Sequence, residues 1–387
     1  MSDKLPNLRH LDAFVKIYEL GTLVAAAKSV NITQPAITQG LARLEQTIDC
    51  KLFERQSDGM QPTDGARLLY PRAVSALRYV GSNRVTHTQM RAFVAIAKWG
   101  GYAPASTATG LARASLKRAV TDLQIAIDKS LVTRVGRGVQ LTTVGKRVAR
   151  RFRLAMNEIE NGVEELEGLK GVDGGHIAIG AMPLSRARVL PSAIVEFKQT
   201  RPAAHISVAE GSYFELVEPL RNGELDFVIG ALRDPPPGAD LVQSELFEDL
   251  PVVVARRDHP LPERKGLVDI RKIAEYDWCI PKIGAPLRAN WERMFSGPGL
   301  SIPNISVECG SVMTIRQILM GTNCLSLLSP DQFAVELDAG LLKIVGQAPD
   351  STRRKIGVTH REGWRPTPLQ DSFIATLKSV SSCSNRS

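Results

Sequence analysis

Residues 33–44 read TQPAITQGLARL, and this segment has the pattern of a helix with one apolar and one polar face. Thr33 is suited to cap the helix, and Pro35 falls in the first turn, where a backbone N–H has no helical partner to lose. The apolar face follows from three residues at helical spacing, Ile37, Leu41 and Leu44. The opposite face carries hydrogen-bonding and phosphate-binding types, Gln34, Thr38, Gln39 and Arg43. The segment therefore predicts a helix whose polar face is free for a ligand.

The neighbouring segments complete a small domain. Apolar residues over 8–17 recur at helical spacing and stop at Gly21, and a second helix follows over 22–27. After the third helix, Asp58-Gly59 separates two short strand-like runs and signals a hairpin. Two helices joined by a short turn, followed by a two-stranded wing, form a winged helix-turn-helix.

The same unit occurs twice in the chain. A shift of 79 residues aligns LDAFVKI at 11–17 with MRAFVAI at 90–96, and the match continues without a gap over about fifty residues. One extra residue in the second copy then aligns Gly65 with Gly145. Because apolar positions and glycines both stay in phase, we predict a duplicated domain of roughly sixty residues.

Positive charge concentrates in these two copies. The 387-residue chain has a formal net charge of +9, but residues 1–153 alone hold 24 Lys and Arg against 10 Asp and Glu. Residues 154–170 hold one Lys against five Glu, and the remainder is nearly balanced, with 24 against 25. This asymmetry favours a polyanion-binding part joined to a neutral part, with nucleic acid as the polyanion.

The first copy resembles the DNA-binding domain of LysR-type transcriptional regulators. The resemblance is carried by NLRHL at 7–11, AAA at 25–27, TQPAIT at 33–38 and LFER at 52–55. It implies that the helix from Gln34 enters the major groove, with some side chains near bases and others on phosphates. The sequence departs from the family at Gln39-Gly40, where a basic and a bulkier residue are usual. The implied DNA contacts are Thr33, Gln34, Pro35, Thr38, Gln39, Arg43 and Arg55.

The second copy differs on the exposed face of its third helix. It lacks the Gln-Pro pair, and its wing over 134–138 is more basic than the first. Lys and Arg on phosphates fix position, whereas contacts to base edges specify sequence. Two alternatives remain: this copy holds DNA with little sequence preference, or it only packs. Its candidate DNA contacts are Arg113, Ser115, Lys117, Arg118, Arg134 and Arg137.

Two further helices are expected around the second copy. Residues 146–169 carry an apolar stripe near heptad spacing, basic at the start and acidic at the end. The resemblance makes this segment a dimerising linker helix, and the alternative is a helix packed on its own domain. Residues 66–80 contain Pro71 and are expected to form a shorter, kinked spacer between the two copies.

Beyond residue 172, strands and helices alternate, which predicts a two-lobed α/β domain with a hinged cleft. IAIG at 177–180, LRNGELDFVIG at 220–230 and DHPL at 258–261 resemble a LysR-type sensor with a periplasmic-binding-protein-like fold. The predicted fold class is thus multidomain α/β. The expected domains are 6–65 and 85–145 for the winged units, 66–84 for the spacer, 146–171 for the linker, and 172–383 for the effector domain, with lobes 172–245 plus 350–383 and 246–349.

Ligands of open α/β sheets bind beyond the carboxyl ends of strands, near helix N-termini. Four loops at 182–185, 211–213, 283–286 and 310–313 meet this description. The serines among them have an alternative role as helix caps. Arg186 or Arg288 would suit a carboxylate. The candidate effector-binding residues are Pro183, Leu184, Ser185, Ser212, Tyr213, Ala231, Gly284, Ala285, Ser311 and Met313.

Several classes of protein are not expected. The chain has no run of eighteen apolar residues and no leader pattern, so we expect neither a membrane-spanning nor a secreted protein. Its five cysteines are scattered, which suits a reduced cytoplasm. No GxSxG, P-loop, HExxH or dinucleotide motif is present, so we expect no enzyme, no cofactor and no metal.

The sequence therefore predicts a nucleoid-associated transcriptional regulator that binds a double-stranded DNA operator. Its effector would be a sugar, an aromatic compound or another small organic molecule bound in the cleft. It would act as a homodimer or homotetramer, and a contact with RNA polymerase stays open. The alternative is a low-specificity architectural DNA-binding protein, which would bind in a salt-dependent manner without sequence preference.

Overall fold

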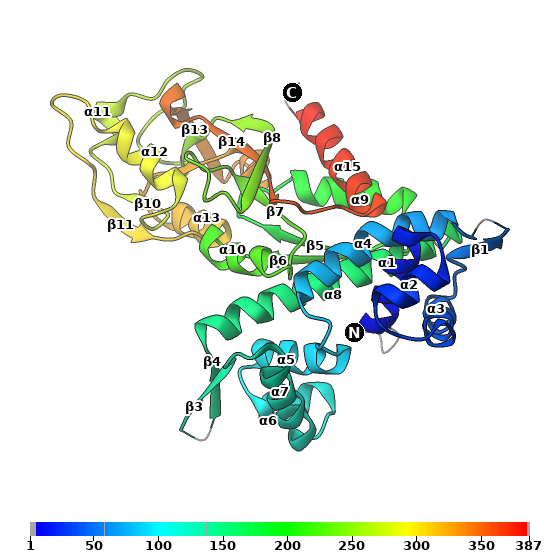
Figure 1. Cartoon of the computed structure of the whole chain (residues 1–387). Coiled ribbons are helices and arrows are strands. Elements are labelled where there is room, and N and C mark those ends of the chain that lie inside the picture. The colour runs from blue at the N-terminus through cyan, green and yellow to red at the C-terminus, as the bar shows by residue number, and fades with distance from the viewer. Residues whose placement is uncertain (1–4, 58, 137, 173, 385–387) are drawn as a thin grey trace. The chain divides into compact units, whose positions relative to one another are not determined.

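The computed structural model describes residues 5–57, 59–136, 138–172 and 174–384 (Figure 1). The chain divides into two compact units, Met1–Gly175 and His176–Ser387. The first unit holds both winged copies and two long helices. The second unit is a two-lobed α/β domain.

The first winged copy has the predicted order of elements. Helices α1 (Leu8–Leu20), α2 (Leu23–Ser29) and α3 (Gln34–Ile48) precede an antiparallel hairpin of β1 (Phe53–Gln56) and β2 (Gly59–Pro62). Gly21 ends α1 in the left-handed conformation, and the Thr22 side chain accepts a hydrogen bond from Ala25 N to start α2. The core side chains include Leu11, Phe14, Ile17, Ile37 and Leu44. Asp58, the first residue of the predicted turn, lies outside the described residues.

The second copy repeats this arrangement in detail. Its elements are α5 (His87–Trp99), α6 (Tyr102–Thr109), α7 (Arg113–Ile127), β3 (Val132–Val135) and β4 (Gly138–Leu141). Asp49 and Asp128 end the third helices with φ of 50° and 51°. The Glu45 carboxylate accepts from Leu52 N at 2.9 Å, and the aligned Gln124 oxygen accepts from Leu131 N at 2.8 Å. The predicted duplication is thus confirmed down to single hydrogen bonds.

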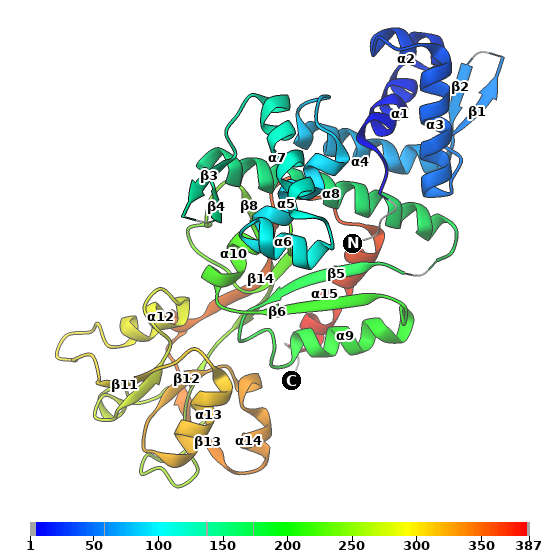
Figure 2. The same cartoon turned by 90° about the horizontal axis from the view of Figure 1, so that it is seen from below.

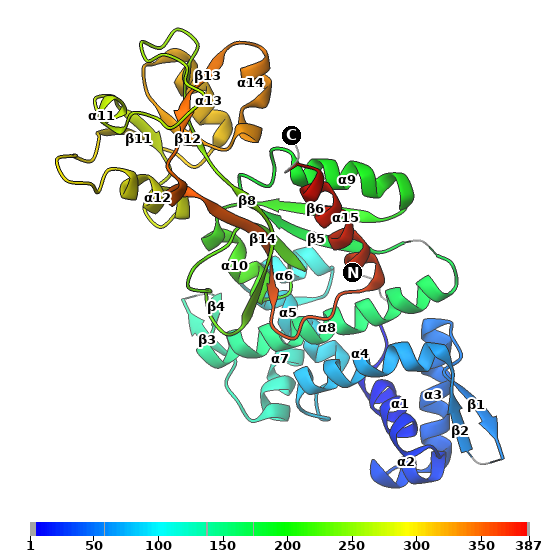
Figure 3. The same cartoon turned by 90° about the horizontal axis from the view of Figure 1, so that it is seen from above.

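Each winged copy continues into a long helix, and these two helices pack antiparallel. They are α4 (Asp64–Val80) and α8 (Thr143–Leu169), which lie side by side in Figures 1 and 3. The start of α4 lies near the end of α8, because a Cβ on Gly65 would contact Leu166, whereas Arg151 in α8 reaches the Tyr79 carbonyl. The segment expected as a spacer is therefore one side of an intrachain helix pair. α8 packs on both α4 and α5 of its own chain, and its role as a dimerising linker stays a prediction.

The first lobe of the second unit is built on a five-stranded sheet. The strand order is β6 (His205–Glu210), β5 (His176–Ala181), β7 (Phe227–Ala231), β14 (Arg354–Arg361) and β8 (Leu241–Asp249). β5, β6 and β7 are parallel, and β14 runs antiparallel to β7 and β8. The last strand thus returns to the sheet of the first lobe. The sequence reading missed β8, and the expected lobe boundary at residues 245 and 246 falls inside this strand.

Helices cover both faces of this sheet. α9 (Val189–Thr200) and α15 (Pro368–Ser384) pack together on one face, with Phe197 edge-on to Phe373 at 5.1 Å between ring centres (Figures 2 and 3). α10 (Tyr213–Arg221) packs on the other face against Ala178 and Val228. Alternate residues of β5 and β7 thus enter different cores, as the two-residue period of a strand requires.

The second lobe has two small sheets. The order β12 (Ser326–Leu328), β9 (Val252–Arg256), β13 (Leu342–Gln347) is antiparallel, and β10 (Trp278–Ile280) pairs with β11 (Ile305–Glu308) in parallel. A core around Trp278, Trp291 and Phe295 holds the lobe together. Its helical segments are α11 (Ile270–Ile273), α12 (Pro286–Met294), α13 (Val312–Gly321), α14 (Ala334–Asp338) and the 3-10 turns Pro330–Gln332 and Asp350–Thr352.

Candidate functional site

The recognition face of α3 is open to solvent. Gln34, Pro35, Gln39 and Arg43 are exposed, and Thr38 is half-buried. Thr33 is the N-cap residue of α3, as predicted, but its side chain makes no capping hydrogen bond. All six predicted residues of α3 and its cap are therefore at least partly accessible to solvent. Arg55 is exposed on β1 in the adjoining wing.

Gly40 sits on the buried side of α3 and has room for a methyl group. A Cβ there would lie 3.6 Å from His10 Cδ2 and 3.9 Å from Ala13 Cβ, which are ordinary contacts. Glycine inside a helix costs about 0.5–1 kcal/mol relative to alanine. We expect Gly40→Ala to stabilise the first copy by about that amount in urea unfolding. Gly21→Ala is the control of opposite sign, because Gly21 has a φ of 70°.

The second copy presents a cationic face at the corresponding place. Arg113, Ser115, Lys117 and Arg118 are exposed at the start of α7. Arg118 lies 4.0 Å from the exposed Asp122, a pairing too weak to hold it away from DNA. Arg134 is exposed on β3, and Arg137 lies outside the described residues. This face has charges suited to phosphates in place of the amide and hydroxyl groups of α3.

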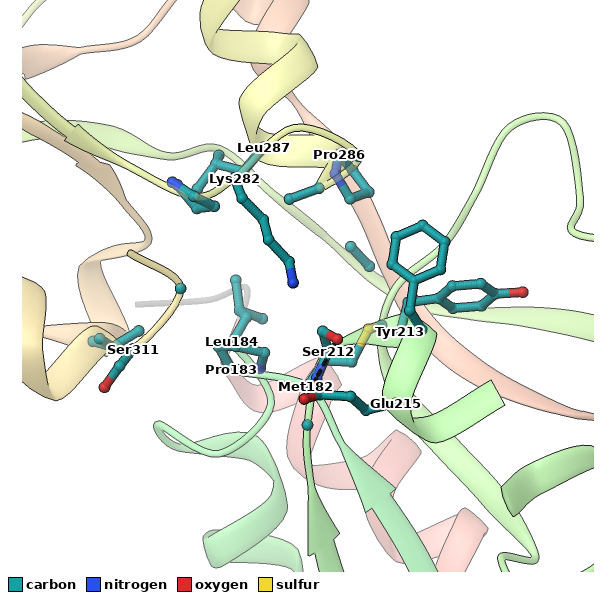
Figure 4. Close-up of a pocket in the computed structure, with 18 of the residues that line it drawn as sticks. Met182, Pro183, Leu184, Ser212, Tyr213, Glu215, Lys282, Pro286, Leu287 and Ser311 are labelled. Atoms are coloured by element: carbon teal, nitrogen blue, oxygen red, sulfur yellow. Dashed lines mark hydrogen bonds between the residues drawn. The ribbon is translucent and has the colours of Figure 1, made fainter. Parts of the chain in front are cut away.

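A cavity of about 470 Å³ lies between the lobes of the second unit (Figure 4). All four predicted loops contribute to its lining, and its size suits a small organic ligand. Eight of the predicted effector residues line it: Pro183, Leu184, Ser212, Tyr213, Ala231, Gly284, Ala285 and Ser311.

The other two predicted effector residues lie elsewhere. Ser185 is buried, and its hydroxyl donates to the carbonyls of Met182 (2.8 Å) and Ile229 (3.1 Å), so it holds the loop in place. Met313 is 72% exposed and is not among the lining residues.

Two serines of the lining also cap helices. Ser212 forms a capping box with Glu215, whose carboxylate accepts from Ser212 N at 2.7 Å and lies 2.7 Å from the hydroxyl. These bonds hold the pKa of Glu215 below its usual value. Ser311 accepts from Thr314 N at 3.4 Å at the start of α13. By contrast, α12 starts at Pro286 without a side-chain cap at Ala285.

Cations border the cavity, but their partners differ. Arg186 is bonded to Glu210, and Arg288 is outside the lining, with contacts to Glu292 at 2.6 Å and Glu308 at 2.8 Å. Lys282 extends into the cavity (Figure 4), and within the described part of the chain no carboxylate lies within 4.0 Å of its amine. The arginines suggested by the sequence are thus engaged, whereas Lys282 is available.

Arg233 is a lining residue that the sequence reading missed. Its guanidinium carbon lies 3.9 Å from the centre of the Tyr213 ring, and burial lowers its pKa. Its buried Nε has no hydrogen-bond partner within the described ranges. The signal in the sequence is its position two residues beyond β7, near the carboxyl end of a strand, where only Ala231 was predicted.

Comparisons with known proteins assign both units of the chain to known families of domains. The model "Bacterial regulatory helix-turn-helix protein, lysR family" matches residues 8–67 and 87–146, and "LysR substrate binding domain" matches 170–382. HTH-type transcriptional regulator GalR of Pseudomonas putida is 30% identical over 390 residues, covering 97% of this chain and 98% of that protein. HTH-type transcriptional regulator CfxR of Cupriavidus necator is 26% identical over 293 residues, covering 76% and 91% of the two chains.

Solved structures share the fold. A full-length OxyR variant of Pseudomonas aeruginosa superposes with a TM-score of 0.55 at 19% identity, covering 76% of this chain and 96% of that one. Full-length CbnR in complex with its target DNA gives 0.54 at 16% identity, covering 76% and 98%. Among the described residues, no helix is long and apolar enough to cross a membrane.

The family models and the full-length relative settle the class of protein. The two matches to the helix-turn-helix model confirm the predicted duplication, and the third match confirms the predicted effector domain. Membership of a family of transcriptional regulators also agrees with the prediction that the chain is not an enzyme. The chain belongs to the LysR family of DNA-binding transcriptional regulators, and it carries the helix-turn-helix domain of that family twice.

Proposed function

We propose that this regulator recognises a specific DNA operator and that a small organic anion in the interlobe cavity controls its binding. The observation that carries the effector class is Arg233, a cavity-lining cation whose buried Nε has no acceptor within the described residues. A buried unpaired donor costs about 1–3 kcal/mol, and a ligand that supplies an acceptor removes this cost. Lys282 adds a second positive charge on the opposite lobe.

The rest of the lining favours an organic acid over an inorganic anion. Apolar side chains, among them Leu184, Phe214, Ile283 and Leu287, surround the cations. Such a cavity suits a carboxylate attached to an aromatic or aliphatic body, because a carboxylate both accepts from Arg233 and neutralises its charge, whereas a hydroxyl of a neutral sugar only accepts. Among the candidate effectors, we therefore favour the acids.

Thermal shift with a panel of small compounds tests the effector class. The probes are benzoate, succinate, gluconate and glucose, added to the full-length protein. We expect at least one acid to raise Tm, and Arg233→Met to weaken its binding about 10- to 100-fold, because a charge-assisted hydrogen bond is worth about 1.5–3 kcal/mol. Arg257→Met is the control, since Arg257 is an exposed residue of the same unit paired with Glu263. Equal binding by wild type and Arg233→Met would refute the anion site.

Sequence-specific recognition is supported by the chemistry of the α3 face. Gln34, Thr38 and Gln39 are neutral donors and acceptors suited to base edges, whereas an architectural protein would need only cations there. Selection from a random duplex library should enrich a defined sequence. Gln34→Ala should then lower discrimination at one position by about 1–3 kcal/mol. Salt-dependent binding without enrichment would favour the architectural alternative.

Control by the effector requires that the two lobes differ in their arrangement when the acid is bound. We propose that closure of the lobes around the acid changes the distance between the winged copies in a homodimer or homotetramer bound to the operator. We also propose that the regulator acts at the nucleoid, where it contacts RNA polymerase. A ligand shifts such an equilibrium only by its differential affinity for the two states. Equal affinity for the selected operator with and without the acid would refute this coupling.

A further inference from the structure

The packing of α4 on α8 is centred on a buried charge cluster. Arg72 of α4 is fully buried, and its Nη2 and Nε donate to Glu165 Oε1 of α8 at 2.6 Å and 3.2 Å. Its Nη1 donates to Glu158 Oε2 at 3.2 Å. One guanidinium on the first copy's helix is thus matched by two carboxylates on the second copy's helix.

The contact extends along the whole of α4. Gly162 allows close approach, because a Cβ there would lie 3.0 Å from Leu69 Cδ1. At the end of α4, Arg151 of α8 donates to the carbonyls of Tyr79 at 2.9 Å and Arg78 at 3.1 Å. At the other end, Lys170 lies 2.8 Å from Asp49, directly after the recognition helix of the first copy.

The repeat alignment shows that α4 pairs better with α8 than either helix would pair with a second copy of itself. With Gly65 aligned to Gly145, Arg72 corresponds to Phe152 and Glu158 corresponds to Arg78. Two first copies paired in the same geometry would place Arg72 against Arg78 of the other copy. Two second copies would place Phe152 against Glu158. Like pairs therefore bring two cations together or set an aromatic ring against a carboxylate, and only the mixed pair satisfies the buried arginine.

We infer that the two winged copies of one chain form a complete pair of DNA-binding domains, held together by the α4–α8 interface. Because α4 and α8 are antiparallel, the two winged copies are attached at opposite ends of the pair. Their recognition helices differ, with neutral polar groups on α3 and cations on α7. The DNA site of one chain is therefore bipartite and asymmetric, with one half read by base contacts and the other held through phosphates. This inference rests on the proposed function for its DNA site.

Carbodiimide cross-linking of the native protein tests whether the pair is intrachain. The reagent joins an amine to a neighbouring carboxylate, and the Lys170 amine is close to the Asp49 carboxylate, which is 95% exposed. We expect the linked Asp49–Lys170 peptides in the band of single-chain mass on a denaturing gel. Their recovery only from the double-mass band would show winged copies exchanged between chains and overturn the inference. Their absence from both bands would overturn the packing itself.

Co-expression of two variants tests whether the intrachain pair is the form that binds DNA. One chain carries Gln34→Ala and Thr38→Ala, and the other carries Arg113→Ala, Lys117→Ala and Arg118→Ala. If the winged copies pair within a chain, every pair contains one mutated copy. The mixture then binds the selected duplex no tighter than the better of the two variants does alone. If they pair between chains, a fraction contains one fully intact pair and binds tighter than either variant alone, which overturns the inference.

The two tests separate this inference from the proposed function. If wild type selects no duplex, the proposed sequence-specific function fails, whereas the cross-link still reports on the intrachain pair. If wild type selects a duplex and the mixture binds it tighter than either variant alone, the function stands and the intrachain pair fails.

Discussion

Arg72→Ala is expected to lower the free energy of unfolding of the N-terminal unit by about 3–5 kcal/mol. The change removes the positive charge that neutralises Glu158 and Glu165, whose side chains are 13% and 4% exposed. Burial alone would lower the pKa of Arg72, but the bonds and charges of Glu165 and Glu158 outweigh it, so the net pKa is raised and the arginine stays charged. Removing one partner leaves buried carboxylates without their counter-ion.

Hydrogen exchange of peptides from α4 and α8 in urea measures this loss. Arg67→Ala is the matched control, because Arg67 is on the same helix but its ion pair with Asp64 is exposed, and its loss should cost less than about 0.5 kcal/mol. Replacing Arg72, Glu158 and Glu165 together by leucine should recover most of the stability, since an apolar cluster has no charge to neutralise. Equal losses for Arg72→Ala and Arg67→Ala would contradict the account.

Gly145→Ala is expected to destabilise the second copy by about 3 kcal/mol or more. Its Cβ would overlap the carbonyl oxygen of Leu131 and lie 3.0 Å from the carbonyl carbon. That carbonyl also accepts from Thr142 N at 3.0 Å, so it cannot move without breaking the junction of wing and helix. At the aligned Gly65 the nearest atom is Cys50 Sγ, a side-chain end at 2.7 Å, and the cost there should be smaller.

Gly168→Ala on the same helix is the control for Gly145→Ala. No atom lies within 4 Å of the Cβ position at Gly168, so the change should stabilise α8 by up to about 1 kcal/mol. Thermal unfolding of the two variants measures both effects. A Tm for Gly145→Ala equal to that of wild type would contradict the close approach of helix and wing.

The duplicated fold was predictable because each copy carries its own helical periodicity, glycines and turn residues. The pairing of α4 with α8 was not. Pro71 indicated only a kinked spacer, whereas the packing depends on ion pairs of Arg72 with acids 86 and 93 residues away in sequence. β8 was missed because its sequence LVQSELFED is rich in polar groups, as suits the outermost strand of its sheet.

The sequence predicted the loops of the candidate cavity better than the contacts of its charged side chains. The cavity loops follow from a general rule about the carboxyl ends of strands, so half of the lining lies in the predicted loops. Arg233 was missed because its importance comes from stacking on Tyr213, a contact between separate elements. The engagement of Arg186 and Arg288 with carboxylates likewise depends on partners that local sequence does not indicate.

The claim that both copies bind DNA is tested most directly by footprints on the selected duplex. The proteins are wild type and the variant with Arg113, Lys117 and Arg118 changed to alanine, compared over a range of salt. We predict that the variant protects a shorter region, binds more weakly, and has a log–log salt slope shallower by up to about 3, since each phosphate contact contributes about 0.9. An unchanged footprint and slope would contradict the account and make the second copy a packing module.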